Sequence, residues 1–224
     1  MLDLMMPRLC VVCDRRLSPT EQVLCASCNF LLPRTDFHRN ADDNVMTRTF
    51  RGIIPVERAA ALFYYKAHSG TSRIIHDLKY HDHPEIGHEM GSMMAREFSS
   101  TSDFFVGIDA IVPVPLSRRR QWHRGYNQSL CIAEGISRAT GLPIYNKVLR
   151  RTKFVKSQTK MKHYERRKNV ENVFRLKDAD AISGHHLLLV DDVVTTGATM
   201  AACAGELLKA GDVRLSLLSI CFTQ

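Results

Sequence analysis

The sequence lacks any long hydrophobic run, and its apolar stretches are far shorter than the roughly 20 residues that cross a bilayer as a helix. Residues 1–7 contain neither a basic segment nor an extended apolar one, which argues against a secretory signal. Gly-x-Gly-x-x-Gly is absent, and so is a Walker A Gly-Lys-Ser/Thr. We therefore expect a cytoplasmic protein that does not insert into a membrane and has neither of these nucleotide-binding loops.

The cysteines do not suit a disulfide framework, because there are seven of them and four form Cys-x-x-Cys pairs. Cys10 and Cys13 form the first pair, Cys25 and Cys28 form the second, and eleven residues separate the two pairs. Two such pairs offer four thiolates to one tetrahedral Zn²⁺, and so short a segment would need the metal in order to fold. We predict a closed structural zinc site. The alternative is two metal-free pairs, one of them redox-active.

Acidic residues are scarce in one part of the chain. From Lys147 to Lys168 there are ten Lys or Arg and one acid, Glu165, a net charge of +9. Since the whole chain carries +8, the remainder carries −1 and is nearly neutral. Such a concentrated positive charge favours polyanions, either pyrophosphate or nucleic acid.

The length and the hydrophobic content of 45% suffice for one core and a small appendage. Residues 33–51 are polar and without periodicity, and we interpret them as a linker; residues 53–56 would begin the main domain. The predicted domains are a zinc ribbon at residues 1–40 and an α/β domain at residues 52–224. Its strands are expected at 59–65, 109–116, 143–148, 187–190 and 215–222, and its helices through 74–78, 86–98, 130–141 and 199–210. This alternation predicts a mostly parallel sheet flanked by helices.

Two adjacent acids follow the apolar run at residues 187–190, which is typical of a buried parallel strand. Asp191 and Asp192 are thus expected at the carboxyl end of that strand, where open α/β sheets bind ligands. The small hydroxyl-rich loop at residues 195–199 then leads into a helix and can present several N–H groups to one anion. Acids for ribose hydroxyls and a loop for a 5′-phosphate together indicate a sugar-phosphate site. A bare acid pair, by contrast, is often a helix cap or a solvated loop.

A second anion site is predicted where the strand at 109–116 ends in Ser117 and three arginines, Arg118, Arg119 and Arg120. Guanidinium forks match phosphate oxygens, although a solvated arginine cluster is an equal alternative. Histidines 76, 81, 83 and 88 surround Lys79, but their spacing matches no metal-ligand pattern, so we interpret them as surface residues.

Several motifs together resemble those of one family. They are Val112-Pro-Val-Pro-Leu116, Arg124-Gly-Tyr-Asn-Gln-Ser129, Lys156-Ser-Gln-Thr159, Arg166-Arg-Lys-Asn-Val170 and the Asp-Asp loop. In this order the chain resembles the ComF-type competence proteins, which join an amino-terminal zinc ribbon to a type I phosphoribosyltransferase-like domain. The resemblance covers essentially the whole chain.

The resemblance implies a site for phosphoribosyl pyrophosphate (PRPP) with Mg²⁺. Asp191 and Asp192 would hold the ribose hydroxyls, directly or through Mg²⁺, and would be the catalytic pair. The basic segment from about Arg151 to Lys168 would be a hood that closes over the ligand. The implied PRPP-binding residues are Thr195, Thr196, Gly197, Ala198, Thr199, Ser117, Arg118, Arg119 and Lys79, and the implied hood residues are Lys156, Ser157, Gln158, Thr159 and Arg166.

One departure separates this chain from purine salvage enzymes of the hypoxanthine–guanine type. Those enzymes have an aspartate base in the phosphate loop, whereas this chain has Thr195 there, so the acceptor stays unassigned. Three functions remain open: a phosphoribosyltransferase in nucleotide metabolism or DNA uptake, a competence factor that handles single-stranded DNA beside a helicase, and a PRPP sensor without turnover. For the second, Phe154 and Tyr164 in the hood could stack on bases.

Overall fold

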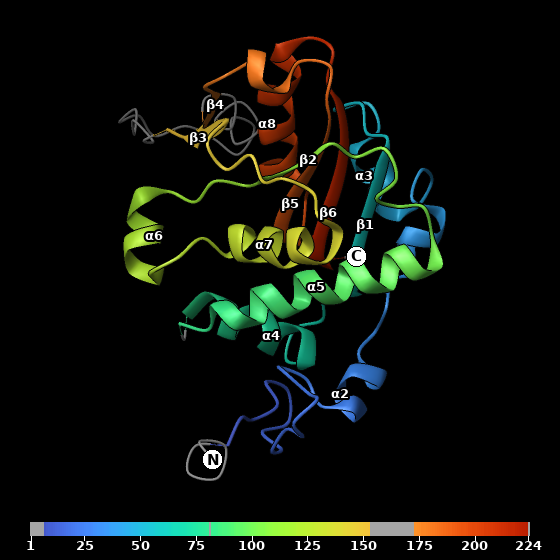
Figure 1. Ribbon diagram of the computed structural model, residues 1–224, viewed down its shortest axis with the longest axis vertical. Helices are drawn as coiled ribbons and strands as arrows, with labels where there is room; N and C mark the ends of the chain where they lie inside the picture. The colour runs from blue at the N-terminus through green and yellow to red at the C-terminus, as the bar shows by residue number, and fades with distance from the viewer. Residues whose placement is uncertain (1–6, 81, 153–172, 224) are drawn as a thin grey trace, which may run out of the picture.

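The computed structural model describes residues 7–80, 82–152 and 173–223, and its centre is a four-stranded sheet (Figure 1). The strands lie in the order β1-β6-β5-β2, and all neighbours run parallel. Their bounds are Arg58–Tyr64 for β1, Arg214–Phe222 for β6, His186–Val194 for β5 and Ala110–Pro113 for β2. This architecture confirms the predicted α/β class, a mostly parallel sheet flanked by helices.

The central strands are buried because helices cover the sheet. Leu187, Leu188 and Leu189 of β5 are fully buried, as a parallel strand covered on both faces requires. Figure 1 shows α7 crossing the strands, with α5 and α4 stacked beyond it. The helices are α4 (Gly70–Tyr80), α5 (Pro84–Thr101), α6 (Arg118–Arg124), α7 (Gln128–Thr140) and α8 (Ala198–Leu207), which continues as the short η5 (Leu208–Ala210).

Helices α5 and α7 approach each other closely because glycines lie at their crossing. A Cβ added to Gly91 would lie 2.1 Å from the Ile132 carbonyl oxygen, and one added to Gly135 would lie 2.1 Å from the His88 carbonyl oxygen. The absence of a side chain therefore lets the two backbones touch, and this contact fixes α7, whose N-terminus faces the candidate site.

The segment interpreted as a linker is folded, which corrects that interpretation. It contains η1 (Phe37–Asn40) and α3 (Val45–Phe50), and it buries Phe37, Met46 and Phe50 in the main core. Asn44 caps α3 through the N–H groups of Met46 and Thr47, and its amide also donates to the Ala59 carbonyl oxygen (2.8 Å). The sequence pattern does not reveal this packing, because the elements are short and their apolar residues are irregularly spaced.

The prediction of a strand at residues 143–148 is also wrong. That stretch makes a single bridge, between Ile144 and Ile111. A short antiparallel pair forms nearby instead, between β3 (Leu149–Arg151) and β4 (Phe174–Leu176). Each has three residues, too few for a recognisable alternation. The other described elements are α2 (Ala26–Leu31) and η4 (Asp180–Ile182).

Within the described parts of the chain, no helix is both long enough and apolar enough to cross a membrane.

Candidate functional site

A cleft of about 490 Å³ opens where β2 and β5 end, at the carboxyl edge of the sheet. It unites residues that lie far apart in the sequence, from Tyr65 to Thr199. The lining residues are Tyr65, Ile75, Lys79, Val114, Pro115, Leu116, Arg120, Arg124, Gln128, Ser129, Arg151, Asp191, Asp192, Val193, Thr195 and Thr199.

Asp191 and Asp192 both reach this cleft, but they lie within β5 rather than after it. The strand continues to Val194 because its backbone stays paired with β6, with Asp191 opposite Ser219. Asp191 Oδ1 accepts hydrogen bonds from Ser129 Oγ and from the Asp192 N–H, both at 2.9 Å. Asp192 Oδ2 lies 3.0 Å from Lys79 Nζ of α4. Two helices therefore orient the two carboxylates.

Ser129 reaches Asp191 because Asn127 holds the start of α7 against β2. The Asn127 side chain accepts the Ser129 N–H (3.2 Å) and donates to the Val114 carbonyl oxygen (3.1 Å). The preceding Tyr126 hydroxyl donates to the Leu78 carbonyl oxygen at 2.6 Å, which joins α4 to the same corner. The run at residues 124–129 thus has a structural reason: it anchors three elements around the acid pair.

The charge of Asp191 is disfavoured. Desolvation in the cleft raises the pKa of its carboxyl well above the usual range, and the neighbouring Asp192 carboxylate adds to the rise by repulsion. The hydrogen bonds from the Asp192 N–H and Ser129, and then the Lys79 charge, act in the opposite direction. A cation or several hydroxyl donors placed here would relieve the repulsion between the acids.

Three arginines from two elements line the same cleft as the acids: Arg120 and Arg124 of α6, and Arg151 of β3. Burial lowers the pKa of Arg151, and repulsion from Arg120 lowers it further. Together with Lys79 these side chains outnumber the two carboxylates, so the cleft favours an anionic ligand.

Arg120 and Arg124 line the cleft, whereas the predicted anion-binding residues Ser117, Arg118 and Arg119 do not. Ser117 caps α6 by accepting the Arg120 N–H (3.3 Å), and Arg118 and Arg119 are exposed on that helix without lining the cleft. The sequence placed Arg120 in the predicted anion site and Arg151 at the start of the predicted hood, but it gave no site role to Arg124 or Ser129. Arg124 and Ser129 stand in a motif quoted for the family resemblance, and this was the available signal.

In the small loop at residues 195–199, Thr195 and Thr199 line the cleft, whereas Thr196 and Ala198 are exposed elsewhere on the loop. Gly197 is buried and adopts a left-handed conformation (φ 72°) just before α8. A Cβ there would lie 2.7 Å from Phe50 Cε1. The loop therefore rests on α3, in the segment that the sequence suggested was a linker.

The predicted hood residues Lys156, Ser157, Gln158, Thr159 and Arg166 lie outside the described residues, as do Phe154 and Tyr164. Strands β3 and β4 flank that segment and pair with each other. Arg151, near the end of β3, is part of the cleft lining.

The four predicted zinc ligands come together. Cys10, Cys13, Cys25 and Cys28 place all their sulfur atoms within 4.8 Å of one another, and the Cys13 and Cys25 sulfurs are 3.8 Å apart. Four sulfurs at about 2.3 Å from one zinc would be roughly 3.8 Å apart, so the donor set fits a tetrahedral zinc. The Cys25 N–H also points at Cys10 Sγ (3.4 Å). The cluster fits a zinc ribbon and could hold a structural zinc.

Two arginines form ion pairs that join the ribbon to the main domain, in addition to apolar contacts such as those of Val12 and Leu32 beside Gly70. Arg73 of α4 pairs with Asp14 at 2.6 Å, and Arg34 pairs with Glu97 of α5 at 3.0 Å. Arg34 also lies over the Phe63 ring, 4.6 Å from its centroid. The same helix, α4, thus contacts the ribbon and carries Lys79.

The histidines around Lys79 do not form one group. His76 lies 3.3 Å from Asp77, His83 lies 2.6 Å from Glu85, and His88 lies 2.8 Å from Glu134, with Cys131 close to the last pair. His81 is outside the described residues. Each of these three histidines therefore has a carboxylate of its own.

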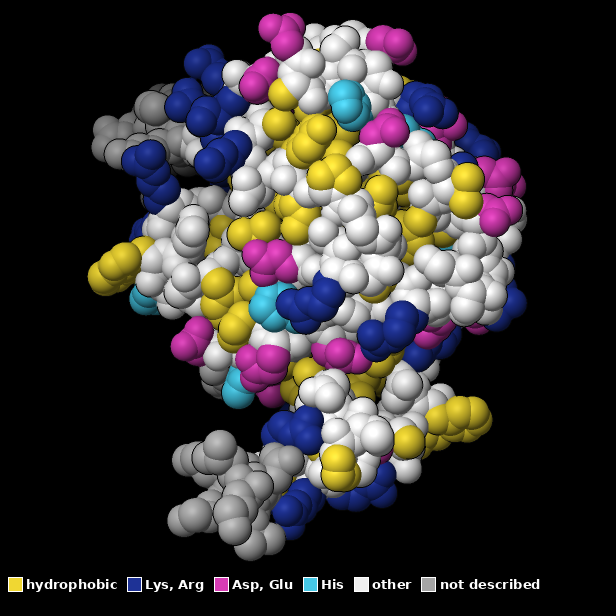
Figure 2. Space-filling view, in the orientation of Figure 1, with side chains coloured by type: hydrophobic (Ala, Val, Ile, Leu, Met, Phe, Trp, Pro, Cys, Tyr) yellow, Lys and Arg dark blue, Asp and Glu magenta, His cyan; other side chains and the backbone are white. Residues whose placement is uncertain are grey.

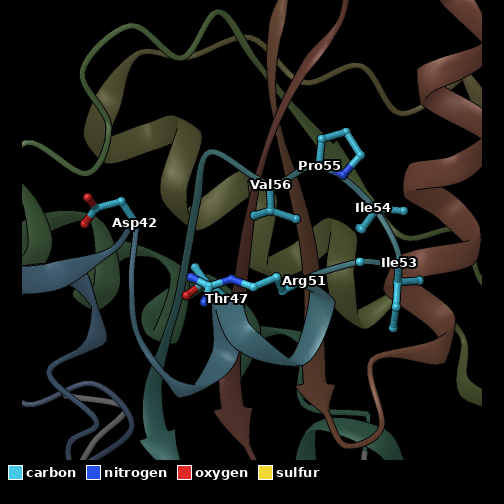
Figure 3. A pocket seen from close by; sticks show the side chains of 8 residues that line it. Asp42, Thr47, Arg51, Ile53, Ile54, Pro55 and Val56 are labelled. Atoms are coloured by element: carbon cyan, nitrogen blue, oxygen red, sulfur yellow. The ribbon is translucent and has the colours of Figure 1, made fainter.

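A second hollow lies beside α3 and is lined by residues 51–56 with Asp42 and Thr47 (Figure 3). The Thr47 hydroxyl is used in the α3 cap, and Arg51 pairs with Asp43 at 3.2 Å. Most of the remaining lining is aliphatic. This hollow does not bring together groups with the charge complement of the cleft at β5.

No family model matches the chain. It is 31% identical over 218 residues to the DNA utilization protein YhgH of Escherichia coli strain K12, which covers 96% of this chain and 90% of that protein. It is 38% identical over 104 residues to Competence protein F of Haemophilus influenzae, covering 46% of this chain and 45% of that protein. A solved adenine phosphoribosyltransferase from Saccharomyces cerevisiae aligns with 62% of this chain and 68% of its own, at 20% identity and a TM-score of 0.36. By its full-length likeness to YhgH, the chain belongs to the family of DNA utilization and ComF-type competence proteins.

Proposed function

We propose that this protein binds PRPP with Mg²⁺ in the cleft at the carboxyl ends of β2 and β5 and transfers its phosphoribosyl group to a nucleophile. One observation carries the proposal: Asp191 and Asp192 share a cleft with Lys79 and three arginines. A ligand that carries ribose hydroxyls beside a diphosphate matches both halves of that charge pattern.

The carboxylates would accept hydrogen bonds from the ribose 2′- and 3′-hydroxyls. Residues Thr195 to Thr199 would hold the 5′-phosphate through their hydroxyls and N–H groups, with the N-terminus of α8 behind them. Lys79, Arg120, Arg124 and Arg151 would neutralise the diphosphate, and Ser117, Arg118 and Arg119 would extend this anion surface outward.

Mg²⁺ suits this donor set, because it prefers carboxylate and phosphate oxygens and is commonly held by one or two carboxylates plus substrate phosphates. When bound, it would neutralise charge on the departing diphosphate. Asp191 and Asp192 would hold it, directly or through the ribose hydroxyls. Its charge would also offset the repulsion that raises the pKa of Asp191.

In the proposed reaction, the nucleophile forms a bond to C1 of the ribose while the bond from C1 to the diphosphate oxygen breaks. Pyrophosphate leaves with that electron pair, and the nucleophile loses a proton. The arginines act by stabilising the charge that develops on pyrophosphate. The phosphate loop has Thr195 where hypoxanthine-type enzymes have an acidic base, so we propose an acceptor that does not need such a base.

A second candidate follows from the relatives, which are named for DNA utilization and competence. In that case the protein acts in the cytoplasm on single-stranded DNA, beside a helicase, and the PRPP site serves as a sensor or a coupled activity. The basic segment at residues 147–168 supports this candidate by its charge.

The test is a calorimetric titration of PRPP, with and without Mg²⁺, into the zinc-loaded protein and into Asp191→Asn/Asp192→Asn. We expect Mg²⁺-dependent micromolar binding that the double substitution weakens at least about 100-fold, because hydrogen bonds to charged groups are each worth about 1.5–3 kcal/mol. Pyrophosphate release with a panel of acceptors then separates enzyme from sensor. Absence of binding to the folded wild type would overturn both.

A further inference from the structure

Helix α6 carries the only tryptophan of the sequence on its outer surface. Trp122 is 85% exposed, a high value for the largest apolar ring, and α6 buries none of its own residues. A shallow hollow beside the ring is lined by Arg118, Gln121 and Gly125, and the His123 ring lies nearly parallel to the indole, 6.4 Å away. Folding of the main domain does not explain this exposure.

The surroundings of Trp122 are strongly basic. The helix reads Arg-Arg-Arg-Gln-Trp-His-Arg, and no acidic residue occurs between Asp109 and Glu134 in the sequence. Among the described residues, Arg118, Arg119 and Arg120 have no carboxylate within ion-pair distance. Their charges are therefore available to a ligand.

The basic surface continues from α6 to the β3–β4 pair. Arg150 and Arg175 stand directly opposite each other across these strands, an arrangement of like charges that costs stability unless an anion joins it. Arg151 of the same pair is close enough to Arg120 of α6 for their repulsion to be felt. Figure 2 shows Lys and Arg side chains gathered at the upper left, beside the place of β3 and β4 in Figure 1, and α6 projects just below.

From these features we infer that α6 is a docking surface for single-stranded nucleic acid, on which Trp122 stacks with a base while Arg118 and Arg119 bind the flanking phosphates. An aromatic platform within a basic surface is the usual means of binding single strands without sequence preference. In a duplex the base faces are covered by their neighbours, so the ring selects unpaired strands. This inference rests on the second candidate under Proposed function and gives that candidate a binding surface.

Other partners fit α6 less well. A membrane-binding helix needs an apolar face, and α6 has one apolar residue among seven. A protein interface of ordinary size needs a wider apolar centre than one ring surrounded by guanidinium groups. Phosphates alone would explain the arginines but not the exposed indole.

Trp122 is also the reporter for the experiment, since it is the sole tryptophan. The full-length zinc-loaded protein is titrated with an oligothymidine of about 15 nucleotides, a length within the range of single-strand sites. We expect the tryptophan fluorescence to be quenched as the strand binds, and a duplex of equal length to quench much less. Fluorescence anisotropy of a labelled oligonucleotide gives Kd for variants that lack the indole.

Trp122→Ala should weaken oligothymidine binding about tenfold, in line with the loss of one base-stacking platform, and Trp122→Phe should recover much of it. Phe30→Ala is the matched control, because Phe30 of α2 is an equally exposed aromatic (88%) on the zinc ribbon and should leave Kd unchanged. Arg118→Gln/Arg119→Gln should lower the slope of log K against log salt by roughly 1.4, since about 0.7 is lost per single-strand phosphate contact.

Three outcomes would overturn the inference: no binding of the oligothymidine, binding without a fluorescence change, or equal Kd for wild type and Trp122→Ala. PRPP calorimetry on Trp122→Ala keeps this test separate from the proposed enzyme, because Trp122 does not line the cleft. Loss of PRPP binding in Asp191→Asn/Asp192→Asn has no bearing on α6, and failure of wild type to bind PRPP leaves the α6 inference intact.

Discussion

The pairing of Lys79 with Asp192 is the contact that most clearly joins separate parts of the chain in the cleft. The two groups are 3.0 Å apart and largely shielded from water, with 23% and 12% of their side chains exposed. An ion pair so sheltered is screened less by salt than a surface pair. It holds Asp192 in place while leaving the lysine beside the proposed diphosphate.

We expect Lys79→Met to weaken Mg²⁺–PRPP binding about tenfold, because one charged hydrogen bond is lost and Asp192 is left without that partner. Calorimetry measures the change. Lys209→Met is the control, since it removes the same charge from an exposed lysine of η5 that pairs with Glu206 and does not line the cleft. Equal weakening by both substitutions would mean that overall charge, rather than this position, governs the affinity.

A buried histidine should make stability depend on pH. Burial lowers the pKa of His186, with added repulsion from Arg214 and Arg58, and its Nε2 lies 2.9 Å from Ser216 Oγ. The folded state therefore favours the neutral ring, whereas the unfolded chain takes up a proton near pH 6.5. Stability from this residue is present above that pH and falls as the pH drops toward the lower folded pKa.

Between pH 7.5 and 5.5 the melting temperature of the wild type should therefore fall relative to that of His186→Asn. The comparison with the variant isolates His186, because the raised pKa of Asp191 acts on stability in the opposite direction over the same range. Differential scanning fluorimetry of the two proteins at several pH values makes the comparison. If the melting temperatures of the two proteins change equally with pH, the acid sensitivity belongs to other groups, such as His38, whose pKa is also lowered by burial.

At the level of elements, the loop at residues 195–199 depends on a helix outside its own motif. Gly197 needs both its left-handed backbone and its missing side chain, since Phe50 of α3 occupies the space beside it. The helix that follows, α8, begins directly after this glycine. A change at Gly197 therefore acts on loop and helix together.

We expect Gly197→Ala to destabilise the protein by about 1–3 kcal/mol and to weaken PRPP binding, because the new methyl clashes with Phe50 and the backbone is strained. Gly205→Ala is the matched control: it lies in α8, nothing is within 4 Å of an added Cβ, and it should stabilise the protein by about 0.5–1 kcal/mol. Urea unfolding of the two variants measures both effects. If Gly197→Ala leaves the free energy of unfolding unchanged, α3 moves aside for the added methyl without loss of stability.

On the scale of the whole molecule, the zinc ribbon and the cleft are joined through α4. Arg73, toward the start of this helix, holds Asp14 of the ribbon, and Lys79 near its end holds Asp192. Apart from Cys10 and Cys25, the ribbon buries few apolar side chains, namely Leu17, Val23, Leu24 and Leu32, so we expect it to depend on the metal.

Cys13→Ser should reduce zinc from about one equivalent per chain to a small fraction, because a structural site of this kind needs four ligands. Metal analysis after gel filtration gives the stoichiometry, and limited proteolysis should then cut within the ribbon. Cys203→Ala is the control, since Cys203 is buried in α8 away from the cluster and should keep the metal. Retention of zinc by Cys13→Ser would argue against a four-cysteine site.

Some features followed from local sequence alone. The strands at β1, β5 and β6 were predicted because continuous apolar runs mark buried parallel strands, and the cysteine cluster because paired spacing fixes which thiolates can meet. The short elements α3, α6 and β4 were not predicted, because three to seven residues show too little periodicity to be recognised.

The sequence by itself determined the α/β class, the acid pair at the carboxyl edge of the sheet and the family likeness, because these depend on order and spacing along the chain. Tertiary structure alone decided which cations meet those acids. Lys79 pairs with Asp192, and Arg120 and Arg151 line the same cleft, whereas Arg118 lies outside it beside Trp122. The physical reason is that the rotation and packing of α4 and α6 select these partners, and contacts between distant segments leave no periodic trace in the sequence.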